Sequence, residues 1–314
     1  MIRSACAIVL LLPLLARAAP DTGMFETAPG VSIYFEKYGD GPQVTIIPGG
    51  LFLGRDFQAL AREDRTLIFY DMRNRGASSS VSDGSILTIL EDVRDLEALR
   101  KHFAVERFNL VGWSYLGLMT VLYVAENPTR VGRLVQIGPV PRQYPGNYPA
   151  EERADGRETP AAAHAAQAAL ERARATGDAS QNQLCALQAR YFSYLLVGDP
   201  KNAARVPDNC RYENEWPGHF QAHLDHHFGD IQKRNFPAAQ FEALTLPVLV
   251  VHGKLDMNAP YGSGREWART FPNARLITLP RAAHFAWLDD PSVIRDVGRF
   301  LDGKWPARAE QLSR

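Results

Sequence analysis

The sequence predicts an α/β fold: a mostly parallel, doubly wound sheet that carries an inserted helical lid. Short apolar strands alternate with amphipathic helices up to about Val140 and again from Pro247, which is typical of such a sheet. The stretch between them, about a hundred residues, loses this alternation, and a structureless loop of that length is improbable in a compact protein. We therefore expect a core of residues 19–140 and 246–314, with a lid at 141–245.

The core elements follow from the periodicity of apolar residues. Leucine and valine recur at helical spacing between Leu87 and Phe103, with acidic residues early and basic residues late, as the helix dipole favours. Another helix is expected around Asp56–Arg62. Lid helices are expected at 161–174 and 181–196, and strands at 31–38, 43–47, 66–70, 133–137, 246–253 and 276–279, besides the one that begins at Phe108.

One junction between a strand and a helix carries most of the functional information. The apolar run from Phe108 passes through Gly112-Trp113-Ser114 directly into a second apolar run. At such a turn a seryl oxygen stands above the edge of a parallel sheet, and the backbone N–H of the next residue, Tyr115, points toward a developing oxyanion. A Gly-x-Ser triplet also occurs in ordinary connections between strands and helices, so its partners downstream decide its meaning.

Two candidate partners for Ser114 follow further along the chain. Asp256 comes just after the apolar strand that ends at Gly253, and His284 follows the strand that ends at Leu279. A histidine can take the seryl proton, and a carboxylate can fix the imidazole tautomer and stabilise its cation. Because the carboxyl ends of parallel strands meet at one edge, we expect Ser114, Asp256 and His284 to form a catalytic triad there.

The segments that carry these residues resemble the nucleophile, acid and histidine segments of α/β-hydrolases. The closest branch is the proline-iminopeptidase-like one, because Asp71–Ser78 resembles its Asp-x-Arg-Gly-x-Gly-x-Ser loop. Ile47–Gly50 stands where the His-Gly-Gly oxyanion loop of that branch is expected. The resemblance covers Val31 to Leu301 except most of the middle.

Three positions depart from the family pattern. Leu116 stands where a glycine usually follows the serine by two positions, and its bulk would crowd a tight turn. Pro48 replaces the histidine of the oxyanion loop, and Asn74 replaces a glycine, which asparagine does readily because it tolerates positive φ. None of these changes removes a catalytic group.

The resemblance implies a serine hydrolase that works through an acyl-enzyme, with the N–H groups of Tyr115 and Gly50 as oxyanion donors. It suggests an aminopeptidase of the proline-iminopeptidase type, in which lid carboxylates bind the free amino terminus of a short peptide. Glu213 and Glu215 are the candidates for that role, although solvated surface acids are the simpler interpretation of each. Trp113 is a further candidate for contact with the substrate. A carboxylesterase is the near alternative, and a non-catalytic binding protein on the same scaffold is an alternative of another class.

The amino terminus reads as a secretory signal peptide. Arg3 precedes an apolar run, and Ala16-Arg17-Ala18 forms an A-x-A cleavage site, so residues 1–18 are expected to be removed; an uncleaved anchor is the alternative. We therefore expect a periplasmic or secreted protein without stable membrane association. Cys185 and Cys210 remain after cleavage, and an oxidising compartment favours a disulfide between them over two separate buried thiols.

Composition excludes some partners and leaves others open. The chain has 35 basic and 35 acidic residues, and it shows no basic run, so nucleic-acid binding is not expected. His219, His223 and His227 share a helical spacing that could hold a metal, but a polar lid helix is the simpler interpretation, and we expect neither a metal nor a cofactor. The expected partner is a small-molecule or short-peptide substrate. The sequence does not indicate an oligomeric state.

Overall fold

The computed structural model describes residues 19–313, so the predicted signal peptide lies outside the described residues. Its centre is a seven-stranded sheet in which β2, β4, β5, β6 and β7 lie side by side and parallel, with β1 antiparallel at one edge. This confirms the mostly parallel sheet. The strands are β1 (Asp21–Ala28), β2 (Val31–Pro48), β3 (Arg65–Tyr70), β4 (Phe108–Trp113), β5 (Val131–Ile137), β6 (Val248–Gly253) and β7 (Ala274–Leu279).

The two strands expected at 31–38 and 43–47 are one long, bent element, β2. Its second half runs parallel to β3, with Val44 opposite Thr66 and Pro48 opposite Tyr70. In its first half the partners on β3 run in the reverse order, from Phe35 opposite Tyr70. The bend lies at Gly39, whose positive φ of 75° suits glycine, and it lets β3 pair with both halves of β2.

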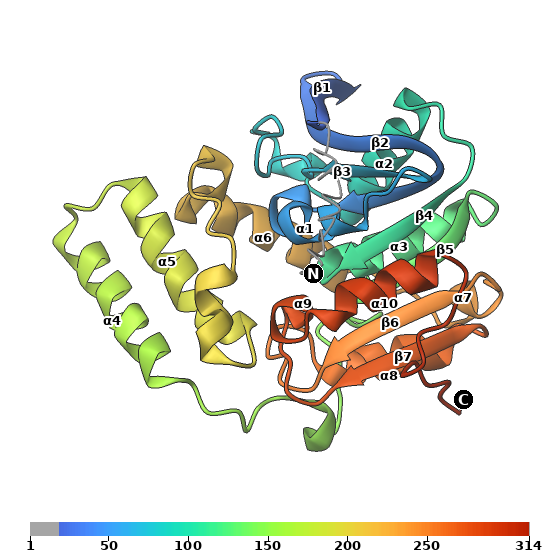
Figure 1. Ribbon diagram of the computed structural model, residues 1–314. Coiled ribbons are helices and arrows are strands. Elements are labelled where there is room, and N and C mark those ends of the chain that lie inside the picture. The colour runs from blue at the N-terminus through green and yellow to red at the C-terminus, as the bar shows by residue number, and fades with distance from the viewer. Residues whose placement is uncertain (1–18, 314) are drawn as a thin grey trace, which may run out of the picture.

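Helices cover both faces of this sheet (Figure 1). On β6, Val248 and Val250 face one core cluster, while Leu249 and Val251 face the other, as the two-residue period of a strand requires. The first cluster includes side chains of α2 (Ile89–His102), α3 (Tyr115–Glu126) and α8 (Tyr261–Thr270); the second includes those of α1 (Gly50–Phe57), α9 (Ala286–Asp289) and α10 (Ser292–Leu301).

The helix expected around Asp56–Arg62 was placed too late in the sequence. The structure has α1 at Gly50–Phe57, followed by a 3₁₀ turn at Gln58–Leu60. The reason is Gly49, which caps α1 in the left-handed conformation, with a φ of 76°, and so turns the chain directly from β2 into the helix.

The segment between β5 and β6 is helical, and its longest part extends away from the sheet (Figure 1). A capping box closes the amino end of α5, because Ser180 accepts from the Gln183 N–H and the Gln183 side chain accepts in return. At the other end of the segment Phe241 is fully buried in the core next to Trp267. The elements are α4 (Ala161–Thr176), α5 (Gln181–Leu196), η4 (Pro200–Arg205), η5 (Glu213–Glu215), α6 (Pro217–Gln232) and α7 (Ala239–Glu242).

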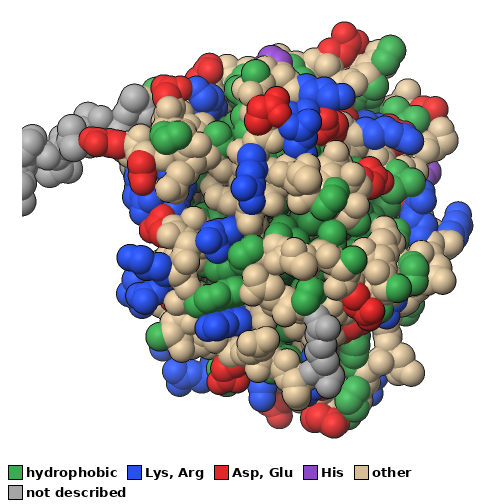
Figure 2. All heavy atoms as spheres, turned by 90° about the vertical axis from the view of Figure 1, so that its right-hand side faces the viewer, with side chains coloured by type: hydrophobic (Ala, Val, Ile, Leu, Met, Phe, Trp, Pro, Cys, Tyr) green, Lys and Arg blue, Asp and Glu red, His purple; other side chains and the backbone are tan. Residues whose placement is uncertain are grey.

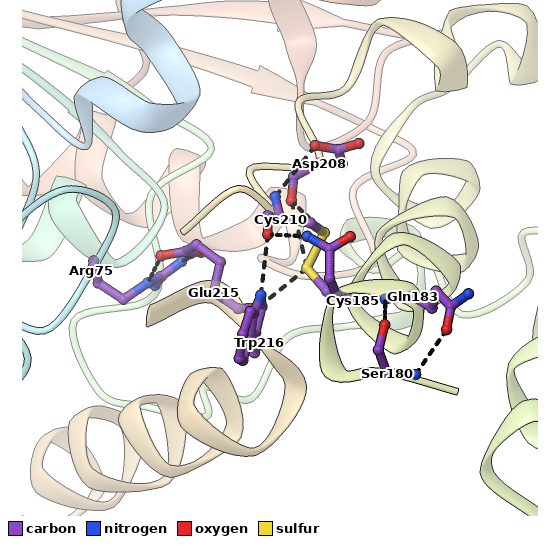
Figure 3. Close-up of a disulfide and its surroundings, with 9 residues drawn as sticks. Arg75, Ser180, Gln183, Cys185, Asp208, Cys210, Glu215 and Trp216 are labelled. Carbon is purple, nitrogen blue, oxygen red and sulfur yellow. Dashed lines mark hydrogen bonds and ion pairs between the residues drawn. A yellow bond between two sulfur atoms is a disulfide. The ribbon is translucent and has the colours of Figure 1, made fainter. Parts of the chain in front are cut away.

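A disulfide joins Cys185 on α5 to Cys210, as expected, with the two Cα atoms 5.7 Å apart (Figure 3). The carbonyl of Cys210 accepts hydrogen bonds from the Trp216 indole at 3.1 Å and from the Asn182 amide at 2.9 Å. The bridge therefore fixes the short segment that carries η5 against α5.

Acidic and basic side chains alternate on the face seen in Figure 2, and neither sign gathers there. No helix within residues 19–313 is long and apolar enough to cross a membrane.

Candidate active site

Ser114 sits in a strained turn between β4 and α3. Its φ of 58° and ψ of −128° lie in a region of backbone conformation that L-amino acids rarely adopt. The turn is closed by two backbone hydrogen bonds: Ser114 N–H donates to Ile137 O at 3.0 Å, and Gly117 N–H donates to Ser114 O at 2.9 Å. Gly112 has no room for a side chain, since a Cβ there would lie 2.6 Å from the carbonyl oxygen of Leu116.

Leu116 is accommodated without loss of this turn. Its side chain is buried and lies over Gly49 in the loop that precedes α1, where a Cβ on Gly49 would come within 2.7 Å of Leu116 Cδ1. The bulk therefore fills space above the oxyanion loop, and Gly49 must be small as well as left-handed. Gly117, one position later than the family pattern, packs on Pro139.

Asp256 and His284 form a buried pair. Nδ1 of His284 lies 2.7 Å from Oδ2 of Asp256, and both side chains are almost fully buried. The other carboxylate oxygen accepts the N–H groups of Asn258 at 2.8 Å and Ala259 at 2.9 Å. Gly138, at the end of β5, leaves space for the pair, because a Cβ there would lie 3.0 Å from Asp256 Oδ2.

The surroundings of Asp256 favour its ionised form. Burial alone would raise its pKa, but the charge of His284 and hydrogen bonds from His252 and His284 outweigh it and hold the pKa below its usual range. Because a carboxylate only accepts hydrogen bonds, Nδ1 of His284 carries the proton, and Nε2 is then free to act as a base. His252 was not anticipated from the sequence; its Nε2 lies 3.4 Å from the same carboxylate.

Ser114 and His284 line one cavity of about 280 Å³ beneath α5 and α6. Its walls are mostly apolar, and Phe52, Phe192, Leu196, Phe220, Leu224 and Phe285 are among the lining residues. Polar and charged side chains also reach it, among them Arg75, Ser114, Glu215, His223 and His284. Such a cavity suits a small organic substrate whose orientation is set by a few polar contacts.

The two predicted oxyanion donors are the first residues of two helices, Tyr115 of α3 and Gly50 of α1. Tyr115 lines the cavity and opens α3, where backbone N–H groups have no partner within the helix. Gly49 and Leu51 line it too, whereas Gly50 lines a neighbouring cavity. Leu51 N–H is already used, because it donates to the buried carboxylate of Asp71 at 2.8 Å. The assignment of Gly50 and Tyr115 stays a prediction.

Trp113 contacts the histidine loop. Its indole N–H donates to the carbonyl oxygen of His284 at 3.0 Å, and the two rings lie 4.8 Å apart. Trp113 also lines the cavity, so contact with a substrate remains compatible with this arrangement.

The two predicted lid carboxylates differ. Glu213 is exposed and is not among the residues that line the cavity. Glu215 lines it and is buried, so its interpretation as a solvated surface acid is wrong. The reason is Arg75, whose guanidinium binds both oxygens of Glu215 at 2.8 and 2.7 Å and so compensates the buried charge (Figure 3).

Two further carboxylates have contacts that no sequence pattern indicates. Asp208 is exposed, lines the cavity and is held near the disulfide, since its Oδ1 accepts the Cys210 N–H at 3.3 Å. Asp289 accepts N–H groups of Gly198 at 2.6 Å and Ala283 at 3.0 Å, so it ties the inserted segment to the loop of His284. Neither belongs to a motif, and only the position of each in the fold identifies it.

The three histidines of α6 have different polar neighbours, although the rings of His223 and His227 stack with their centroids 4.0 Å apart. His219 Nε2 lies 2.6 Å from the side-chain oxygen of Asn74, and His227 Nε2 lies 3.1 Å from Asp92. His223 lines the cavity. Within residues 19–313 no group of three or more histidine, cysteine, aspartate or glutamate side chains is arranged to hold a metal ion.

Comparisons with known proteins agree with the fold. A profile of the alpha/beta hydrolase fold matches residues 47–291. The chain is 25% identical to a proline iminopeptidase of Xanthomonas citri over 300 residues, which cover 87% of this chain and 92% of that one. It is 24% identical to a pimeloyl-[acyl-carrier protein] methyl ester esterase of Nitrosomonas europaea over 270 residues, 83% and 95% of the two chains. Among solved structures, a 2-hydroxy-6-oxo-6-phenylhexa-2,4-dienoate hydrolase from a Rhodococcus strain superimposes with a TM-score of 0.66 at 19% identity, covering 90% of this chain and 99% of that one.

Proposed function

Because this chain belongs to the α/β-hydrolase fold family, whose curated relatives include proline iminopeptidases and an esterase, we propose that it is an exported serine hydrolase. It cleaves an ester or amide bond through Ser114, His284 and Asp256. The observation that carries the proposal is the buried Asp256–His284 pair, whose histidine lines the same cavity as a serine in a strained turn.

The reaction proceeds in two halves. The oxygen of Ser114 attacks the substrate carbonyl while Nε2 of His284 takes its proton, and the N–H groups of Tyr115 and Gly50 stabilise the oxyanion. The bond to the leaving group then breaks, and His284 returns the proton to the departing alcohol or amine. Water, deprotonated by His284, attacks the acyl-enzyme, and collapse of the second oxyanion releases the acid and restores Ser114.

Three single variants test this assignment. Ser114→Ala, His284→Ala and Asp256→Asn should each lower kcat by several orders of magnitude, with circular dichroism and thermal unfolding close to those of the wild type for Ser114→Ala. The assay is a panel of p-nitrophenyl esters and aminoacyl p-nitroanilides. Wild-type turnover by Ser114→Ala would contradict the proposal.

The relatives support an aminopeptidase that acts on small amino-terminal residues such as proline. A carboxylate beside the cavity would then pair with the substrate ammonium. Asp208 suits this role because it lines the cavity. Glu215 suits it less, since Arg75 already binds both of its oxygens. Because the Glu215 carboxylate is already paired with Arg75, the alternative, a carboxylesterase on small acyl esters, gains support.

A comparison of carboxylate variants distinguishes the two substrates. Asp208→Asn, and Glu215→Gln combined with Arg75→Met, should reduce kcat/KM for prolyl p-nitroanilide about 10- to 100-fold more than for p-nitrophenyl butyrate if the enzyme is an aminopeptidase. Glu213→Gln is the matched control, because Glu213 is exposed outside the cavity. Equal small effects on both substrates would make the esterase the better assignment.

We further propose that residues 141–245 act as a lid over the cavity. Support comes from α5 and α6, which contribute lining residues such as Phe192 and Phe220. The disulfide within this segment agrees with export through the signal peptide at residues 1–18.

A further inference from the structure

One wall of the Ser114 cavity contains a chain of buried polar groups for which the proposed reaction has no use. It begins at Tyr115, whose hydroxyl donates to Asp92 Oδ2 at 2.8 Å, and continues to His227, whose Nε2 lies 3.1 Å from the same oxygen. It ends at His223, whose ring stacks on that of His227 with centroids 4.0 Å apart. The side chains of Asp92, His223 and His227 are each at most 2% exposed.

One hydrogen bond orients the ring of His227. Its Nδ1 lies 3.0 Å from the carbonyl oxygen of His223, and a carbonyl only accepts, so this nitrogen carries a proton. Its Nε2 faces the Asp92 carboxyl group at 3.1 Å without a hydrogen bond of good geometry. The ring of His227 in turn supports the stacked ring of His223.

His223 also carries a polar atom without a partner. Its Nδ1 is buried and, like Asp92 Oδ1 and His227 Nε2, has no hydrogen-bond partner among residues 19–313; His227 Nε2 at least faces the Asp92 carboxyl group at 3.1 Å. Leaving a buried polar atom unpaired is costly, so leucine or phenylalanine would be the stable choice on this apolar face of α6. The ring is also kept neutral: burial, His227 and Arg75 lower the pKa of His223 far below its usual range. A neutral imidazole offers one donor and one acceptor.

The position of His223 indicates which part of a substrate it meets. The leaving group departs beside His284, because His284 gives it a proton. His284 lies with Trp113 and Phe285, whereas α6 lies against Tyr115, whose ring packs edge-on against His227 at 5.2 Å. The α6 wall is thus on the acyl side of Ser114.

We propose that His223 forms a hydrogen-bonding subsite for the acyl part of the substrate and receives an uncharged polar group there, such as a hydroxyl. The ring of His227, which lies beside Asp92 and Tyr115, stacks on the ring of His223 and so orients it. This inference rests on the proposed function only for the direction of the acyl group.

The test compares p-nitrophenyl butyrate with its 2-hydroxy and 3-hydroxy derivatives. Wild type should prefer one hydroxy ester over butyrate by about 2- to 12-fold in kcat/KM, the range for one hydrogen bond. His223→Leu should abolish that preference while still hydrolysing butyrate, and His223→Gln, which keeps a donor and an acceptor, should retain part of it. His226→Leu on the same helix is the control, because His226 is exposed and should keep the full preference.

The subsite and the proposed function fail in different ways. An unchanged preference in His223→Leu, or no preference in wild type, would overturn the subsite and leave the hydrolase intact. If wild type hydrolyses no ester, the proposed function falls, and the subsite is tested by binding instead. Calorimetry then measures the binding of butyramide and its hydroxy derivatives to Ser114→Ala, with and without His223→Leu. Tighter binding of a hydroxy amide that is lost with His223→Leu supports the subsite, whereas equal binding of all the amides overturns it.

Discussion

At the scale of single residues, Trp113 connects the strand before Ser114 to the loop that carries His284. The hydrogen bond from its indole to the carbonyl of His284 fixes the backbone that carries the imidazole. A residue that acts only through His284 would affect the rate of the chemical step, whereas one that touches substrate would also affect binding.

Trp113→Phe separates these two roles. Phenylalanine keeps the aromatic packing on Phe285 and loses the N–H donor. One lost hydrogen bond of about 0.5–1.5 kcal/mol should lower kcat by about 2- to 12-fold with KM unchanged. Steady-state kinetics on a p-nitrophenyl ester check this, and a change confined to KM would assign Trp113 to substrate binding instead.

Asp71 gives the fold a pH dependence of its own. Burial raises its pKa from 3.8 to about 7, although the N–H groups of Ala77 and Leu51 donate to it. The folded protein therefore holds a proton that the unfolded chain releases near pH 4, so the contribution of Asp71 to the free energy of unfolding falls as pH rises from about 4 to 7. Because each unit of pKa difference corresponds to 1.36 kcal/mol, the largest loss of unfolding free energy from this titration is on the order of 4 kcal/mol.

Denaturant unfolding at pH 4 to 8 measures this contribution against Asp71→Asn, which keeps an oxygen for the Leu51 N–H. The difference between their free energies of unfolding should shift in favour of the variant as pH rises through this range. A difference that does not change with pH would show that Asp71 titrates normally.

At the scale of elements, Arg157 joins the end of α5 to the loop that carries Asp256. Its guanidinium donates to carbonyl oxygens of Leu195 at 3.0 Å and Leu255 at 3.1 Å, and also to those of Tyr194 and Val197. The carboxyl end of a helix has unpaired carbonyls and partial negative charge, so a cation suits it. Leu255 directly precedes Asp256, so loss of this contact should also affect the position of the Asp256 carboxylate.

Arg157→Ala should therefore lower both stability, by about 1–3 kcal/mol, and kcat. The exposed Arg172 on α4 supplies the control variant, Arg172→Ala, which should change neither. Chemical denaturation and ester hydrolysis measured on the same samples check this, and a loss of stability with full kcat would refute the link to Asp256.

The disulfide is the second device at this scale. Closing a loop of 25 residues stabilises by roughly 3.5 kcal/mol through chain entropy. Removing it should free η5, whose Glu215 binds Arg75 across the cavity. We expect the variant with Cys185→Ser and Cys210→Ser to be cleaved by trypsin within residues 141–245 much faster than the wild type. Equal rates of cleavage would show that packing alone holds the segment.

At the scale of the whole molecule, the sheet and the strands before Ser114, Asp256 and His284 could be predicted because they depend on local periodicity and turn chemistry. These three strands are short and mostly apolar, which leaves little choice of structure. Contacts across the insertion were not predictable. The pairing of Glu215 with Arg75 and of His227 with Asp92 joins residues 140 and 135 positions apart, and no local pattern marks either pair.

Export is a property of the whole chain as well. If the signal peptide is cleaved at the A-x-A site, mature protein from its native host begins near Ala19 and lacks Cys6, so all of its thiols are in the disulfide. Amino-terminal sequencing and thiol titration of denatured, unreduced protein check this. A start at Met1, or two titratable thiols, would contradict it.

The most direct test of the central claim is covalent labelling of the serine. A fluorophosphonate probe reacts only with an activated serine, so it also separates an enzyme from a non-catalytic binding protein on the same scaffold. The account predicts one adduct per chain by intact mass, located on Ser114 by peptide mapping, absent from Ser114→Ala and formed far more slowly in His284→Ala. An unlabelled wild-type protein, or an adduct that persists in Ser114→Ala, would contradict it.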